Sequence, residues 1–139
     1  MNNYSLQFDG YCWRGNETTA PTASGIYCAY SCVKQNGQFF VSELLYIGQA
    51  GNLRQRLTQH TNAGDFDLEI ANAKVVFYAW ATLDGRSLDA CEAAMIYHFQ
   101  PRYNTQNKNS FTGHDITSVS SSGKWAFRVA GTFTQEPTV

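Results

Sequence analysis

The hydrophobic pattern in the first third of the chain predicts an antiparallel hairpin. Residues 25–33 and 39–47 are rich in β-branched and aromatic side chains, as strands are. The Asn36-Gly37 pair between them is typical of a tight hairpin turn. We therefore expect one hairpin over residues 25–48.

Further along, apolar residues recur with helical spacing in two segments. Residues 52–60 predict a short helix with Asn52 as its N-cap. Residues 74–81 are apolar without alternation, which indicates a central strand covered on both faces. Residues 87–99 predict a second helix, which Pro101 ends.

The remaining segments complete an α+β fold, in which helices pack on a small mixed or antiparallel sheet with extra terminal strands. The pattern predicts an edge strand at 3–13, loops at 14–24, 62–69 and 103–113, a turn at 118–123 and a late strand at 124–133. The 139 residues show no repeat and no linker, so we expect a single domain over residues 1–139.

Composition narrows the class of protein. The apolar content of 43% is that of a globular chain, and its apolar runs are too short to cross a membrane. The N-terminus lacks the regions of a signal peptide, so we expect a cytoplasmic protein. Four cysteines are scattered without a C-x-x-C pair, which predicts reduced, mostly buried thiols rather than a zinc site.

The formal net charge of −1 is unusual for a nucleic-acid-binding protein, which usually has a basic excess. Either the partner is of another kind, or a small basic patch is offset by acidic residues elsewhere.

Candidate chemistry appears first on the two predicted helices. Arg56 and His60 are one turn apart and project together from the edge of the buried face, whereas Arg54 points to the other side. A solvated arginine and a helix-end histidine would give the same pattern. Glu92 falls within the apolar sector of the second helix, where a carboxylate is costly unless it pairs with an arginine or binds a cation. A lone glutamate suits a hydrated hard cation such as Mg²⁺.

Tyr27 and Tyr46 lie on the two arms of the hairpin, where ordinary strand packing would also explain them. A tyrosine is a poor base unless nearby cations lower its pKa, and Arg56 and a metal ion at Glu92 would supply that field. A metal ion and an arginine would stabilise charge on phosphorus, while a tyrosine or histidine moves a proton. The combination indicates phosphodiester hydrolysis.

At this point the sequence resembles the GIY-YIG nuclease family. Gly25-Ile26-Tyr27 and Tyr46-Ile47-Gly48 match its two name-giving motifs, and Arg56, His60 and Glu92 follow in the family's order. The segment EAAMIYHFQPRYN looks like the family's glutamate helix and closing P-x-Y-N. The resemblance covers a core over residues 25–104, to which residues 1–24 and 105–139 are additions.

The resemblance implies a catalytic set of Tyr27, Tyr46, Arg56, His60, Glu92 and Asn104. Glu92 would bind a single divalent metal ion, Mg²⁺ or Mn²⁺, and Arg56 would hold the scissile phosphate. Tyr27 would serve the attacking water as general base or positioner, and Tyr46 would orient the phosphate or the water network. His60 would be an auxiliary proton or phosphate group, and Asn104 would fasten the end of the core near the site.

The implied function is a metal-dependent endonuclease that acts on nucleic acid, with DNA favoured over RNA and a homodimer or partner protein as an option. The near-neutral charge favours the alternative, a non-catalytic nucleic-acid-binding or protein-interaction module. Gly25 and Gly48 are expected to be structural. Expected nucleic-acid contacts are Lys34, Gln49, Arg54, Arg102 and Lys108, with Lys124 and Arg128 as further basic candidates. The acidic loop of Asp65, Asp67 and Glu69 is expected to face away from the substrate.

Overall fold

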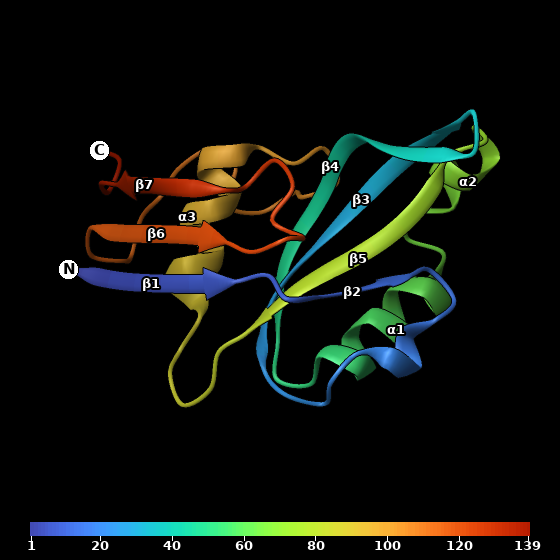
Figure 1. Ribbon diagram of the computed structural model, residues 1–139. Coiled ribbons are helices and arrows are strands. Elements are labelled where there is room, and N and C mark those ends of the chain that lie inside the picture. The colour runs from blue at the N-terminus through green and yellow to red at the C-terminus, as the bar shows by residue number, and fades with distance from the viewer.

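The computed structural model describes residues 1–139 and contains two β-sheets with helices on both faces of the larger one (Figure 1). The elements in chain order are β1 (Asn2–Gln7), β2 (Gly10–Trp13), the 3₁₀ helix η1 (Glu17–Thr19), β3 (Gly25–Gln35), β4 (Gln38–Ala50), α1 (Leu53–Ala63), α2 (Asp67–Ala71), β5 (Val75–Thr82), α3 (Asp89–Phe99), β6 (Thr117–Ser122) and β7 (Gly131–Gln135). The predicted α+β class is confirmed.

The larger sheet is antiparallel throughout and has the order β2-β5-β3-β4. β3 and β4 form the predicted hairpin, and Asn36 and Gly37 both have the positive φ that a two-residue turn requires. β5 lies between β2 and β3 with nearly all of its side chains buried, as its unbroken apolar run predicted. β4 is left as an edge strand, and the candidate active site is built along that edge.

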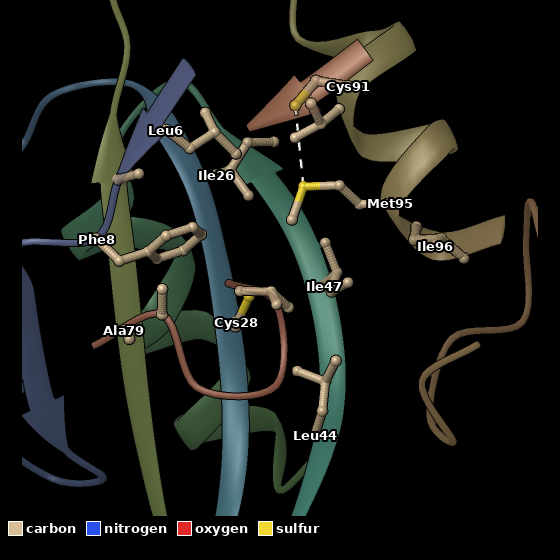
Figure 2. Close-up of a cluster of buried hydrophobic side chains, with 14 of the residues drawn as sticks. Leu6, Phe8, Ile26, Cys28, Leu44, Ile47, Ala79, Cys91, Met95 and Ile96 are labelled. Carbon is tan, nitrogen blue, oxygen red and sulfur yellow. Dashed lines mark hydrogen bonds between the residues drawn. The ribbon is translucent and has the colours of Figure 1, made fainter. Parts of the chain in front are cut away.

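The two faces of the larger sheet carry separate cores. On one face, Leu53 and Leu57 of α1 pack against a cluster that includes Tyr27, Leu45 and Tyr78. The other face is covered by α3 and by the smaller sheet. In Figure 2, Met95 and Cys91 of α3 point toward Ile26 and Ile47, and Leu6 and Phe8 from the N-terminal segment approach β3 and β5.

Strands β1, β6 and β7, which lie outside residues 25–104, form the smaller sheet in the order β1-β6-β7, whereas β2 joins the larger sheet. β1 pairs in parallel with β6, although the two strands are more than a hundred residues apart in sequence. Thr117, Val119 and Ser121 point inward and are buried. Figure 1 shows both chain termini at the same end of this sheet, away from the hairpin.

Four local predictions were wrong. The expected edge strand at 3–13 is two strands, β1 and β2, in different sheets. The expected loop at 62–69 contains the start of α2, and the expected turn at 118–123 is β6. The expected strand at 124–133 is mostly a loop that leads into β7 at Gly131.

All four cysteines are free and buried, as predicted. Burial raises the pKa of the Cys28 thiol to about 12, which makes it unreactive at neutral pH. No helix is long and apolar enough to cross a membrane.

Candidate active site

Tyr27 and Tyr46 meet on the α1 side of the hairpin because of the strand register. Tyr27 lies opposite Gly48, and Tyr46 lies opposite Ala29, so the two tyrosines are diagonal neighbours on one face. Their ring centroids are 6.0 Å apart. Gly48 makes this arrangement possible, since a Cβ there would lie 2.4 Å from both Cζ and Oη of Tyr27.

Tyr27, His60 and Asp65 form a hydrogen-bonded chain. The Tyr27 hydroxyl is 2.6 Å from Nε2 of His60, and Nδ1 of the same ring is 2.6 Å from a carboxylate oxygen of Asp65. A carboxylate only accepts, so the imidazole carries its proton on Nδ1 and donates it to Asp65. Nε2 is then an acceptor, and the buried Tyr27 hydroxyl donates to it.

The protonation states follow from burial. Burial and the nearby Arg56 charge lower the pKa of His60, whereas the hydrogen bond to Asp65 raises it. The net shift of the His60 pKa is downward, so the imidazole is neutral at pH 7. Burial also raises the pKa of Tyr27, with Tyr46 adding to the rise and Arg56 opposing it. Arg56 lowers the Tyr27 pKa in the expected direction, but burial outweighs its effect. Tyr27 is a phenol whose proton points at a neutral histidine.

Arg56 is half-buried in α1 beside the two tyrosines and has no carboxylate partner. Nη1 of Arg56 donates a long hydrogen bond, 3.4 Å, to Oε1 of Gln59, and the guanidinium also interacts with the Tyr27 and Tyr46 hydroxyls. Burial lowers the pKa of Arg56, but the Tyr27 and Tyr46 hydroxyls raise it, and the net pKa is above its usual value. A permanently charged guanidinium therefore faces a hollow lined by Tyr46, His60 and Asp65.

Glu92 reaches the same edge from α3. Its Oε2 accepts the backbone N–H of Gln49 at 2.9 Å, and its Oε1 lies 3.4 Å from the Gln49 side-chain amide. No lysine or arginine pairs with it, so the alternative of a structural ion pair is not observed. Burial raises the pKa of Glu92 above its ordinary value, although the Gln49 hydrogen bonds lower it.

The donor set around Glu92 fits a hydrated divalent cation. Glu92 lines a polar hollow with Asn104, Thr105 and Gln106, all of which offer oxygen atoms. The hollow has a volume of about 220 Å³, which leaves room for several waters around an ion. No cluster of three or more acidic, histidine or cysteine ligands occurs, so a fully protein-bound ion is not supported. One carboxylate with many waters is the manner in which Mg²⁺ commonly binds.

Asn104 fastens the free edge of β4. Its side-chain oxygen accepts the N–H of Ile47 at 3.0 Å, and its side-chain nitrogen donates to the Ile47 carbonyl at 2.9 Å. The backbone N–H of Tyr103 also donates a hydrogen bond to this edge, to the Leu45 carbonyl at 2.9 Å. Asn104 therefore takes the place of a neighbouring strand beside Ile47, the residue next to Tyr46.

The five expected nucleic-acid contacts are scattered. Gln49 alone is within the site, bonded to Glu92 and Asp89. Arg102 is held by a bidentate pair with Glu43 and by Glu69, and Arg54 donates to the Ala20 carbonyl. Lys108 donates to the Pro101 carbonyl, and Lys34 lies near the hairpin turn, far from Tyr27.

Asp65 is the site residue that the sequence patterns missed. The acidic loop was expected to face away from the substrate, and this prediction was wrong for Asp65, which lines the Arg56 hollow. Gly64 ends α1 in the left-handed conformation, and the chain turns so that the Asp65 N–H reaches the His60 carbonyl. The sequence offered one signal for this contact: His60 in the last turn of the predicted helix, with Gly64 and Asp65 shortly after it.

Comparisons with known proteins returned matches among solved structures alone. No family model matches the chain, and no curated protein matches it. Two solved structures are similar, both point mutants of the GIY-YIG N-terminal endonuclease domain of UvrC from Thermotoga maritima, and each is described as bound to its catalytic divalent cation. The mutant in which alanine replaces an asparagine has a TM-score of 0.46 and 22% identity over 67% of this chain and 94% of its own. The mutant in which phenylalanine replaces a tyrosine has a TM-score of 0.46 and 24% identity over 66% of this chain and 94% of its own.

Proposed function

We propose that the chain is a metal-dependent endonuclease that hydrolyses phosphodiester bonds of nucleic acid, with DNA as the favoured substrate. One observation carries the proposal: a cation and an anion, Arg56 and Glu92, are both without an ion-pair partner on either side of Tyr46. An anionic phosphate that bridges to a divalent cation would complement both charges at once.

The proton pathway runs through Tyr27. A water that approaches the phosphorus gives its proton to the Tyr27 oxygen, while the Tyr27 proton passes to Nε2 of His60. The resulting imidazolium is stabilised by Asp65 across the 2.6 Å contact. The phenol therefore never needs to become a free phenolate, which its raised pKa disfavours.

Arg56 acts on the phosphate. Its guanidinium would donate to the non-bridging oxygens, where negative charge grows as water attacks. Glu92 would hold the divalent ion, which supplies a positive charge to the phosphate and the departing oxygen when bound. Gln49 keeps the Glu92 carboxylate oriented through its backbone N–H.

The decisive experiment is a cleavage panel with duplex, branched and single-stranded DNA and with RNA, each with Mg²⁺ and with Mn²⁺. The wild type should cut at least one of them, and Glu92→Gln should not. Glu136→Gln, which changes an exposed glutamate near the C-terminus, is the matched control and should cut normally. An inert wild type on every substrate would leave the non-catalytic alternative, whose binding would survive Glu92→Gln.

A further inference from the structure

A second surface gathers aromatic rings beyond the candidate active site. A groove with a volume of about 190 Å³ crosses strands β2 to β5 and the loop that precedes β7. Six of its eight lining side chains are aromatic and none is charged; the aromatic ones are Tyr11, Trp13, Phe39, Phe77, Trp125 and Phe127. We call this surface the aromatic groove.

The rings of the aromatic groove are held in place by polar contacts behind them. Tyr30 donates its hydroxyl to the Phe127 carbonyl at 2.6 Å, and Arg128 donates to the carbonyls of Val41 and Ser42 at 3.1 Å each. Arg128 has a φ of 65°, a conformation that costs a non-glycine residue free energy. The loop is therefore fixed against β3 and β4, and the groove is preformed.

The rims of the aromatic groove combine partly exposed aromatic side chains with positive charge, and the Tyr11 and Trp125 rings stack on each other with centroids 3.8 Å apart. Phe39 is 46% exposed, Tyr11 37% and Phe127 36%, values that are high for large apolar side chains. Lys34 lies 5.6 Å from the centre of the Phe39 ring, and Lys124 lies 5.3 Å from the centre of the Trp125 ring. Both ammonium groups lie over these rings, where a nucleobase that stacked on a ring would take their place and leave them to its phosphates.

We propose that the aromatic groove binds unpaired bases of a nucleic-acid strand. Each base would stack on an exposed ring, while Lys34 and Lys124 meet the backbone phosphates. An apolar partner protein would gain nothing from the two lysines, and a second copy of the chain would bring like charges together. The proposal draws on the proposed function only for the class of ligand, and its test needs no cleavage.

The Phe39 end of the aromatic groove is distant from Tyr27, and the groove lies on the opposite face of the larger sheet, since Phe77 belongs to the core under α3 and Tyr27 to the core under α1. Phe39 pairs with Lys34, which is seven residues along β3 from Tyr27, or about 23 Å at strand spacing. A substrate that reaches both places must therefore include an unpaired stretch beside the cleaved bond. The aromatic groove thus favours branched or frayed nucleic acid over a continuous duplex.

The hairpin supplies a matched pair of variants. Phe39 and Phe40 are neighbours in β4 with 46% and 47% exposure, but Phe39 alone lines the groove. Fluorescence anisotropy with a labelled 12-nucleotide oligo(dT), in EDTA and low salt, measures binding without metal. The wild type should bind oligo(dT) more tightly than a 12-base-pair duplex. Phe39→Ala should weaken oligo(dT) binding about tenfold, as the loss of one stacked base does, and Phe40→Ala should change it less than about twofold.

Several results would overturn the proposal. Equal affinities for Phe39→Ala, Phe40→Ala and the wild type would remove the groove from the binding site. Tighter binding of the duplex would show that phosphates alone are recognised. A concentration-dependent dimer that Phe39→Ala dissociates would assign the groove to a second copy of the chain. Oligo(dT) binding by a cleavage-inactive protein would support the groove while the proposed function fails, so the two failures are distinguishable.

Discussion

Gly48→Ala tests the close contact between the two strands at the site. A Cβ on Gly48 would lie 2.4 Å from Cζ and Oη of Tyr27 and 2.8 Å from Cε1, much closer than carbon atoms approach without displacement. The Tyr27 ring is 1% exposed and hydrogen-bonded to His60, so it has no free space to enter. Overpacking of this kind costs about 1–3 kcal/mol, and a weakened hydrogen bond adds about 1 kcal/mol.

The expected result is a loss of about 2–4 kcal/mol in the free energy of unfolding, measured by urea titration. Nuclease activity should fall by about 100-fold even where the variant is fully folded, because a shift of about 1 Å in a reacting group has that effect. Gly51→Ala is the matched control, since a Cβ there meets nothing within 4 Å. In a Tyr27→Leu background, Gly48→Ala should cost much less, because the clashing atoms are gone. Gly48→Ala and Gly51→Ala proteins of equal stability and activity would refute the reasoning.

Three further predictions concern charge. Glu92→Gln should raise the midpoint temperature of unfolding in EDTA, because burial raises the pKa of the wild-type carboxylate and so disfavours its charged form. Mg²⁺ should raise the midpoint temperature of the wild type and leave that of the variant unchanged. Asp65→Asn should lower the maximal cleavage rate at least about tenfold. It should also move the acidic limb of the pH–rate profile to lower pH, because Asp65 raises the His60 pKa. An acidic limb that stays in place would exclude His60 as the proton acceptor. The pKa of His60 in the folded state lies below its ordinary 6.5, so the folded state binds fewer protons than the unfolded state. The free energy of unfolding should therefore decrease as pH falls below 6.5, and it should decrease less in His60→Gln. Urea titrations at about pH 5.5 and 7.5 would check this.

Local sequence signals were sufficient to predict the hairpin, and the family motifs selected most of the residues that the structure brings together at the candidate site. The Asn36-Gly37 turn pairs Gln35 with Gln38, but Tyr27 lies opposite Gly48 only because the register shifts twice, between Ser31 and Cys32 and between Ala29 and Tyr30. Asn52 begins α1 by accepting the Gln55 N–H. Once these are set, the helical spacing of Arg56 and His60 brings both beside the tyrosines. Glu92 was recognisable because a carboxylate in an apolar sector of a helix is costly to bury unless it is paired or binds a cation. In the structure, Glu92 has no lysine or arginine partner.

The terminal sheet and the support behind His60 depend on contacts that no local pattern reveals. β6 has few strand-forming residues, and its partner is β1, at the other end of the chain. The 124–133 segment alternates like a strand, but Arg128 turns the chain and the aromatic rings pack from a loop. Asp65 was missed because its role arises from the left-handed turn at Gly64, not from any spacing along the helix.

Most of the arginines of this near-neutral chain are already engaged within the fold. Five of the six arginines hold the chain's own carboxylates or carbonyls: Arg14, Arg54, Arg86, Arg102 and Arg128. Arg56 alone has no such partner, so few cations remain for phosphates outside the fold. Arg56, Lys34 and Lys124 together predict a salt dependence of single-strand binding with a log–log slope of about −2, because each phosphate contact contributes about −0.7. A slope steeper than about −4 would need about six phosphate contacts, which is more than Arg56 and the four lysines supply, so some of the five engaged arginines would have to leave their present partners on binding.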